Sequence, residues 1–252
     1  MPKKKKAIQS GNGFLFKVVR FFIGIAILPS AMAVCASFLQ LIIPYMKDSG
    51  LVKPAVVGVL LYGLIAYAGR KSRNTSNRLY VAAHEFSHAL TALLFGGKVL
   101  GIKIKKTHGE VMLSKSNFVI GLAPYFLPLY AWIVVIAYFI ANHFFPYAGI
   151  KPWFMAAIGF FLSFHFIHTA DILSGPLQPD LEEEGGRFFS YPVIIIFFCM
   201  SVLAIFALMS PGTHSLGEAA KVFASDQKIF YQKAFYLLKY IYYNLSRFIA
   251  SR

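Results

Sequence analysis

Long runs of apolar residues alternate along this chain with short polar or basic connections. Six runs are long enough to cross a bilayer as helices, because one crossing needs about 20 apolar residues. The predicted spans are residues 20–46, 54–69, 77–96, 118–145, 152–173 and 191–210. This pattern predicts an all-α polytopic membrane protein with about six transmembrane helices. Pro29 lies inside the first span, where we expect a kink or a tilt.

Residues 97–117, between the third and fourth spans, depart from this pattern. Gly96-Gly97 ends the third span, and the run Thr107-His108-Gly109-Glu110 has the composition of a turn between two apolar, partly β-branched stretches. Such an arrangement predicts a small β-hairpin. The alternative is a basic loop that its lysines hold at the lipid headgroups.

The carboxyl-terminal region has a third pattern. Beyond the last span, apolar residues recur at helical spacing with lysines between them. This predicts an amphipathic helix on the membrane surface, and the alternative is a helix packed against the bundle. We therefore divide the chain into a membrane-embedded domain, residues 1–212, and an amphipathic helix within residues 213–252.

Composition and charge narrow the class of partner. Of the 252 residues, 58% are hydrophobic and 14% are charged, which excludes an ordinary soluble domain. The formal net charge of +15 arises mostly at the termini and between apolar runs. The expected partner is therefore a surface of anionic lipid headgroups, and no nucleic acid.

The basic residues also predict a topology. Four consecutive lysines within residues 1–6 precede the first apolar run and place the amino terminus inside, rather than serving as a nuclear signal. With six crossings the basic carboxyl-terminal tail is also inside. The hairpin lysines then fall outside, against the positive-inside rule, and a hairpin folded into the membrane edge softens that conflict.

The first span imitates a signal peptide, with Ala31-Met32-Ala33 as a cleavage site. Its apolar character continues to residue 46, longer than a signal core, so we interpret it as an uncleaved anchor. Cys35 and Cys199 lie in separate apolar runs, and we expect both to be small buried hydrophobic residues.

A His-Glu-x-x-His motif lies inside the third span, as His84, Glu85 and His88. Residues four apart share a helix face, so the two imidazoles can bind one zinc ion while Glu85 lies beside them as a general base. Ionisable residues are costly in a membrane segment and usually serve a purpose there. The structural alternative is that the three side chains only form hydrogen bonds to neighbouring helices.

A catalytic zinc site needs a third protein ligand and an open position for water. On the fifth span, His165, His168 and Asp171 are spaced by three residues and project to one side. The strongly acidic segment 174–190 offers Asp180, Glu182, Glu183 and Glu184. A ligand from that segment requires the chain to re-enter the membrane, which is tolerated only inside protein or a wet cavity. His165 already lies at a suitable depth.

Two regions of the chain resemble the site-2 protease class of intramembrane zinc metalloproteases, in particular its compact bacterial branch without a PDZ domain. The first region is His84-Glu85-Phe86-Ser87-His88-Ala89, followed by Gly96-Gly97-Lys98-Val99 and the predicted hairpin. The second begins at Phe164-His165, includes Gln178-Pro179-Asp180-Leu181 and ends at Phe189-Ser190, so the resemblance covers roughly residues 77–191. In that class an aspartate of a Leu-Asp-Gly motif is the third ligand. By resemblance this implies Asp180, although Leu181 stands in place of the glycine.

The resemblance implies a zinc-dependent endopeptidase of the bacterial cytoplasmic (inner) membrane, which cuts membrane-protein substrates in or near their transmembrane segments. The implied metal ligands are His84, His88 and Asp180, with Glu85 as the catalytic base. Three alternatives remain, which are an inactive protease-like scaffold, a metal transporter using the same histidines, and a different His-Glu-x-x-His protease with a glutamate as third ligand. A transporter normally spreads ionisable groups along a path, whereas here they cluster in two places.

Overall fold

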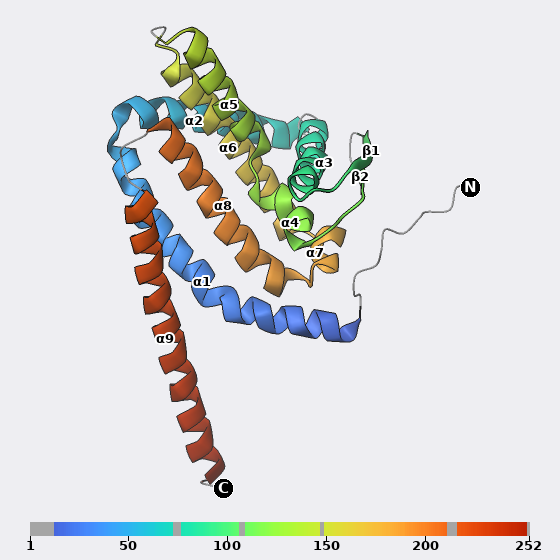
Figure 1. Ribbon diagram of the computed structural model, residues 1–252, viewed down its shortest axis with the longest axis vertical. Coiled ribbons are helices and arrows are strands. Elements are labelled where there is room, and N and C mark those ends of the chain that lie inside the picture. Colours follow the sequence, from blue (N-terminus) through green and yellow to red (C-terminus); the bar gives the residue numbers. More distant parts are fainter. Residues whose placement is uncertain (1–12, 73–76, 106–108, 147–148, 211–215, 251–252) are drawn as a thin grey trace, which may run out of the picture.

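The structure is a computed structural model that describes residues 13–72, 77–105, 109–146, 149–210 and 216–250. In this part of the chain the fold is mostly helical, with one two-stranded antiparallel sheet (Figure 1). The elements are α1 Phe14–Lys47, α2 Ser49–Ser72, α3 Asn77–Leu94, β1 Val99–Ile104, β2 Gly109–Leu113, α4 Phe118–Phe126, α5 Leu129–Phe144, α6 Lys151–Ser174, α7 Pro179–Glu183, α8 Arg187–Met209 and α9 Leu216–Ala250. The prediction of a helical fold with a small hairpin is confirmed. The predictions on residues 1–6, on Thr107 and on His108 lie outside the described residues.

Four of the described helices, α1, α2, α6 and α8, are long and apolar enough to cross a membrane, as expected of an integral membrane protein. They match the predicted spans 20–46, 54–69, 152–173 and 191–210. The predicted span 118–145 is instead two helices, α4 and α5, which are bent by 77°. The remaining predicted span forms α3, which is not among the candidates. The described residues thus contain four or five candidate spans, and the count of six is not confirmed.

The break between α4 and α5 has a chemical cause at Pro128. Proline has no amide hydrogen, and its ring collides with the carbonyl four residues earlier, so α4 ends and a new helix begins at Leu129. At the other end of α4, the side chain of Asn117 accepts a hydrogen bond from the amide of Ile120 (2.9 Å) and caps the helix. The result is a short buried helix that lies against α3.

Small residues bring α2 and α6 into close contact. A side chain at Gly58 of α2 would collide with the carbonyl of Ala156, and one at Gly159 of α6 would collide with the carbonyl of Ala55. Each helix therefore presents a glycine to the backbone of the other, a packing common between membrane helices. The adjoining core contains the buried side chains of Leu51, Val135, Met155, Ile158, Ile205 and Met209.

α1 and α8 run side by side in the same direction (Figure 1). Near the start of both helices, Gly24 lies against the main chain of Phe188. Near their ends, the ring centroids of Tyr45 and Phe206 are 6.2 Å apart. This pairing places the amino-terminal part of α1 next to the start of α8, where α7 also lies.

The two cysteines meet at the interface between α1 and α8. Both are free thiols and both are half-buried, so neither is the fully buried residue that we predicted. The Cys35 and Cys199 side chains lie close to one another. Their separation by more than 160 positions in the sequence concealed this proximity.

The hairpin pairs β1 with β2 in antiparallel register and lies beside α3. Ile102 faces Val111 and Ile104 faces Gly109, with an irregularity between Val99 and Gly101. Gly109 and the following Glu110 therefore belong to β2 and not to the predicted turn. The hairpin prediction is confirmed, and the strand that follows the turn begins two residues earlier than we expected.

α9 packs against α1 with its first half and extends away from the other helices with its second (Figure 1). At the contact, Asp226 is buried and accepts hydrogen bonds from Ser37 (2.7 Å) and Gln40 (3.0 Å). The predicted helix is present, and its first half fits the alternative of a helix packed against the bundle. Exposed apolar side chains in its second half include Phe235, Tyr236, Leu237, Leu238, Tyr240 and Tyr242.

Candidate metal centre

Helix α3 presents both histidines of the motif on one face. His84 and His88 are four residues apart, and their ring centroids lie 4.9 Å apart. Between them, the hydroxyl of Ser87 donates to the carbonyl of Ala83 (2.7 Å), so its polarity is satisfied within the helix. His88 is buried and His84 is half-buried. The two imidazoles therefore point into the protein with one side still accessible.

The one-turn helix α7 brings Asp180 to these histidines. Its Oδ2 atom lies 3.1 Å from Nε2 of His84 and 3.6 Å from Nε2 of His88. Burial alone would raise the pKa of the Asp180 carboxyl, but the contacts with His84 and His88 outweigh burial and hold that pKa below its usual range. The acidic segment thus folds back to the motif, as the resemblance implied.

Local sequence explains why α7 forms and where it ends. Pro179 occupies the first helical position, where its missing amide hydrogen costs nothing. Leu181 is buried in the same core cluster as α4 and α8 and anchors the turn. Gly185 and Gly186 then adopt φ values of 102° and 82°, which favour glycine, and the chain reverses into α8.

The donor set and its spacing fit a zinc ion. Ligand atoms of His84, His88 and Asp180 all lie within 4.8 Å of one another, and they form the one such cluster among the described residues. Two ligands at zinc-bond length on a tetrahedral ion are about 3.4 Å apart. The observed nitrogen-to-oxygen distances of 3.1 and 3.6 Å bracket that value. Two imidazoles and one carboxylate also leave a fourth position for water.

Two neighbouring groups on α4 orient these ligands. Nδ1 of His88 lies 2.7 Å from the carbonyl oxygen of Ile120, which can accept only if Nδ1 carries the proton. Nε2 then keeps its lone pair for a metal. The hydroxyl of Tyr125 donates to Oδ2 of Asp180 (3.1 Å). Partners of this kind fix ligand orientation in metal sites.

Glu85 lies beside the cluster and under the hairpin. Its side chain is buried, and a Cβ at Gly109 of β2 would collide with its carboxyl group. The strand can approach this closely only because residue 109 has no side chain. The hairpin therefore covers the candidate catalytic base.

The structure does not bring the other candidate ligands into the cluster. Nε2 of His165 lies 3.2 Å from the carbonyl of Tyr125, and Nε2 of His168 lies 2.8 Å from the hydroxyl of Tyr62. Asp171 is exposed on α6. The side chains of three glutamates also point away from the cluster: Glu182, Glu183 and Glu184. His165 is buried next to α4, so it supports Tyr125 rather than a metal.

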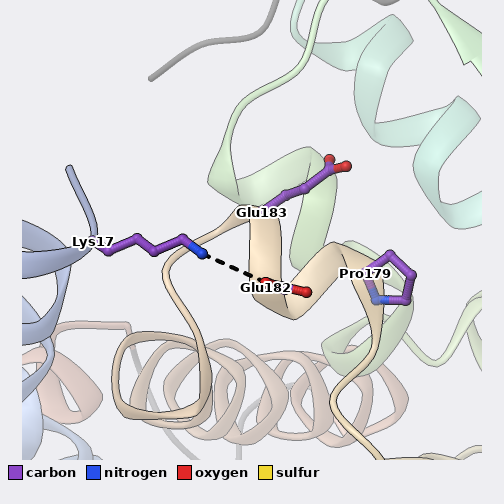
Figure 2. A pocket seen from close by; sticks show the side chains of 4 residues that line it. All are labelled: Lys17, Pro179, Glu182 and Glu183. Carbon is purple, nitrogen blue, oxygen red and sulfur yellow. Dashed lines mark hydrogen bonds and ion pairs between the residues drawn. The ribbon is translucent and has the colours of Figure 1, made fainter. Parts of the chain in front are cut away.

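The two faces of α7 differ in what they contact. Figure 2 shows the outer face, where Pro179, Glu182 and Glu183 line a shallow pocket and Lys17 of α1 forms an ion pair with Glu182 at 3.5 Å. Asp180 and Glu184 are four residues apart and point into the protein. The acidic segment therefore has two kinds of carboxylate. Those of Glu182 and Glu183 are exposed to solvent, and those of Asp180 and Glu184 contact partners inside the protein.

Sequence reasoning missed Tyr125, Gly109 and Arg20. Tyr125 lies in an apolar run and carries no distinguishing signal. Arg20 did carry a signal, because it is the first residue of a predicted apolar span, where a charge is costly without a partner, and the acidic segment was available as that partner. The contact between Gly109 and Glu85 depends on the exact placement of the hairpin.

Comparison of the chain with protein-family models, curated proteins and solved structures found no match. A proposed function therefore rests on the geometry of the cluster itself.

Proposed function

We propose that this chain is a zinc-dependent intramembrane endopeptidase, which hydrolyses peptide bonds in or near the transmembrane segments of other membrane proteins. The proposal rests on one observation: ligand atoms of His84, His88 and Asp180 lie within 4.8 Å of one another, beside the buried Glu85. The bacterial cytoplasmic membrane, with its anionic lipids, is the proposed location.

The roles of the residues follow from their chemistry. A zinc ion held there would polarise the scissile carbonyl and lower the pKa of a bound water to about 7. Glu85 takes a proton from the attacking water and returns it to the amine that leaves. His88 stays in one tautomer because the Ile120 carbonyl accepts its Nδ1 proton. Tyr125 holds the Asp180 carboxylate toward the histidines.

The hairpin is the proposed holder of the substrate. A transmembrane helix hides its amides in hydrogen bonds, so it must unwind before attack, and an extended segment can then add to a strand edge. Within the described residues the sheet has two strands, so each has an unpaired outer edge, and Gly109 of β2 lies against Glu85. Ile102→Pro or Ile104→Pro removes an amide donor from β1, and unchanged cleavage in both variants excludes pairing along that edge.

The test combines metal content with cleavage. Purified protein in lipid nanodiscs is assayed for bound zinc and for cutting of a single-span reporter with a helix-weakening Asn-Gly pair at its centre. Glu85→Gln should keep zinc and lose cleavage, whereas His84→Ala and Asp180→Ala should lose both. A scaffold would show no cleavage by the wild type. A transporter would retain metal flux in Glu85→Gln.

A further inference from the structure

Arg20 of α1 forms a nearly buried ion pair with Glu184, the residue just after α7, and we call this contact the joint. Its Nη1 atom donates to Oε2 of Glu184 at 2.8 Å and to the carbonyl oxygen of the same residue at 2.9 Å. Only 17% of the arginine side chain and 11% of the glutamate side chain are exposed. The guanidinium also lies over the rings of Phe16 and Phe189, at 4.6 and 4.4 Å from their centroids. This arginine is therefore enclosed by partners from three segments.

Two glycines make the joint close-fitting. A Cβ at Gly121 of α4 would lie 2.8 Å from the Glu184 carboxylate, so α4 approaches the acid directly. Gly185 has φ +102°, and a Cβ there would lie 2.7 Å from Cβ of Arg20. The chain after Glu184 is thus pressed onto α1, and it has little room to shift without breaking the ion pair.

The joint acts on the same helix turn that carries the third candidate ligand. Asp180 and Glu184 are four residues apart, and the amide of Glu184 donates to the carbonyl of Asp180 at 3.1 Å. Fixing Glu184 therefore fixes the direction in which Asp180 points. A buried ion pair of this kind is costly to break, because the remaining charge loses its partner.

We propose that Arg20 is a positioning residue for the metal centre: the two hydrogen bonds from its Nη1 atom to Glu184 hold α7 so that the Asp180 carboxylate meets His84 and His88. The inference rests on the proposed function, since it assigns Arg20 a role in metal binding. The guanidinium contacts neither the metal ligands nor Glu85 and acts only through α7. Lysine at this position offers a compact ammonium in place of the planar guanidinium that lies over Phe16 and Phe189, so it should substitute incompletely.

The test measures zinc affinity by chelator competition in the full-length protein, together with the absorption spectrum of the cobalt-substituted protein. Arg20→Gln should weaken zinc binding at least about tenfold, the scale seen when residues that orient ligands are removed. Its cobalt spectrum should match that of Asp180→Asn, because both lack the same ligand. Arg20→Lys should fall between wild type and Arg20→Gln.

Lys17→Gln is the matched control, because it breaks an ion pair between the same helix and the same segment whose side chains are 49% and 61% exposed. It should bind zinc within about twofold of wild type. The double variant Arg20→Gln/Asp180→Asn should bind no more weakly than Asp180→Asn alone, because both changes act through one ligand.

Each outcome decides between the two proposals. Wild-type zinc affinity in folded Arg20→Gln, or additive losses in the double variant, overturns the role of Arg20 and leaves the proposed function intact. A wild-type protein that binds no zinc overturns both. If Arg20→Gln does not fold, the same measurements are made on Arg20→Lys and Glu184→Gln. If both variants have the zinc affinity and the cobalt spectrum of the wild type, the inference is wrong.

Discussion

Replacing Tyr125 with phenylalanine removes one hydroxyl from the wall of the metal centre and little else. The hydroxyl donates to Oδ2 of Asp180 at 3.1 Å, and this oxygen is the one that faces both histidines. The ring itself packs edge-on against His84, with 5.4 Å between centroids, and phenylalanine preserves that contact. The perturbation therefore isolates a single hydrogen bond to a candidate ligand.

The expected change in zinc affinity depends on whether the hydrogen bond forms before or only after the metal binds. A hydrogen bond to a charged group contributes about 1.5–3 kcal/mol, which corresponds to a factor of roughly 10–100 in an equilibrium constant. Because the bond is already present without a metal, only its orienting effect on Asp180 changes zinc affinity. We therefore expect Tyr125→Phe to weaken zinc binding by about tenfold, the lower end of that range.

The assay is chelator competition on purified protein, with Tyr130→Phe as the control. Tyr130 also reaches α3, but its hydroxyl donates to the carbonyl of Leu79 (2.9 Å) and not to the cluster. Its loss should leave zinc affinity within about twofold of wild type. If both variants bind zinc as wild type does, Tyr125 does not orient a ligand and the assignment of Asp180 is in doubt.

Three further predictions test other parts of the structure. Gly109→Val pushes β2 away from Glu85, so reporter cleavage should fall about 10- to 100-fold while the zinc content stays constant. Unchanged cleavage contradicts the close approach of β2 to Glu85. Removing bound zinc with a chelator should lower the thermal midpoint of unfolding, because zinc at 100 times its Kd stabilises the fold by about 2.7 kcal/mol; an unaltered midpoint argues against the site. Gly159→Ala should destabilise the fold by about 1–3 kcal/mol through overpacking against Ala55. Gly63→Ala should not, because the space around Gly63 is open. Equal thermal midpoints of the two variants contradict the α2–α6 contact.

Hydrophobic periodicity predicted where the helices lie but not how they are interrupted. The runs at 20–46 and 152–173 became α1 and α6, and α1 is one helix although Pro29 and Pro44 lie inside it. The run 118–145 is equally apolar, yet Pro128 divides it into two helices at 77° to one another. Apolar content does not register such a bend, and a proline in the sequence does not by itself predict one, because Pro29 and Pro44 leave α1 a single helix.

The candidate site was predictable only in part, and for a similar reason. Spacing along one helix was enough to pair His84 with His88. Asp180 came from the resemblance, since residue spacing alone left His165 at a suitable depth. His165 in fact points at the Tyr125 carbonyl. Contacts between distant segments depend on packing, which no local pattern in the chain encodes.

The joint between Arg20 and Glu184 also sets an order of events during synthesis. It links residues 164 positions apart, and the contact between His84 and Asp180 spans 96 positions. At about 5–20 residues per second, Arg20 is synthesised roughly 8–33 s before Glu184. During that interval it has Phe16, one turn earlier on the same helix, as a local partner. The three ligands can converge only after residue 180 has been made, so zinc capture would mark a late stage of assembly and not its nucleus.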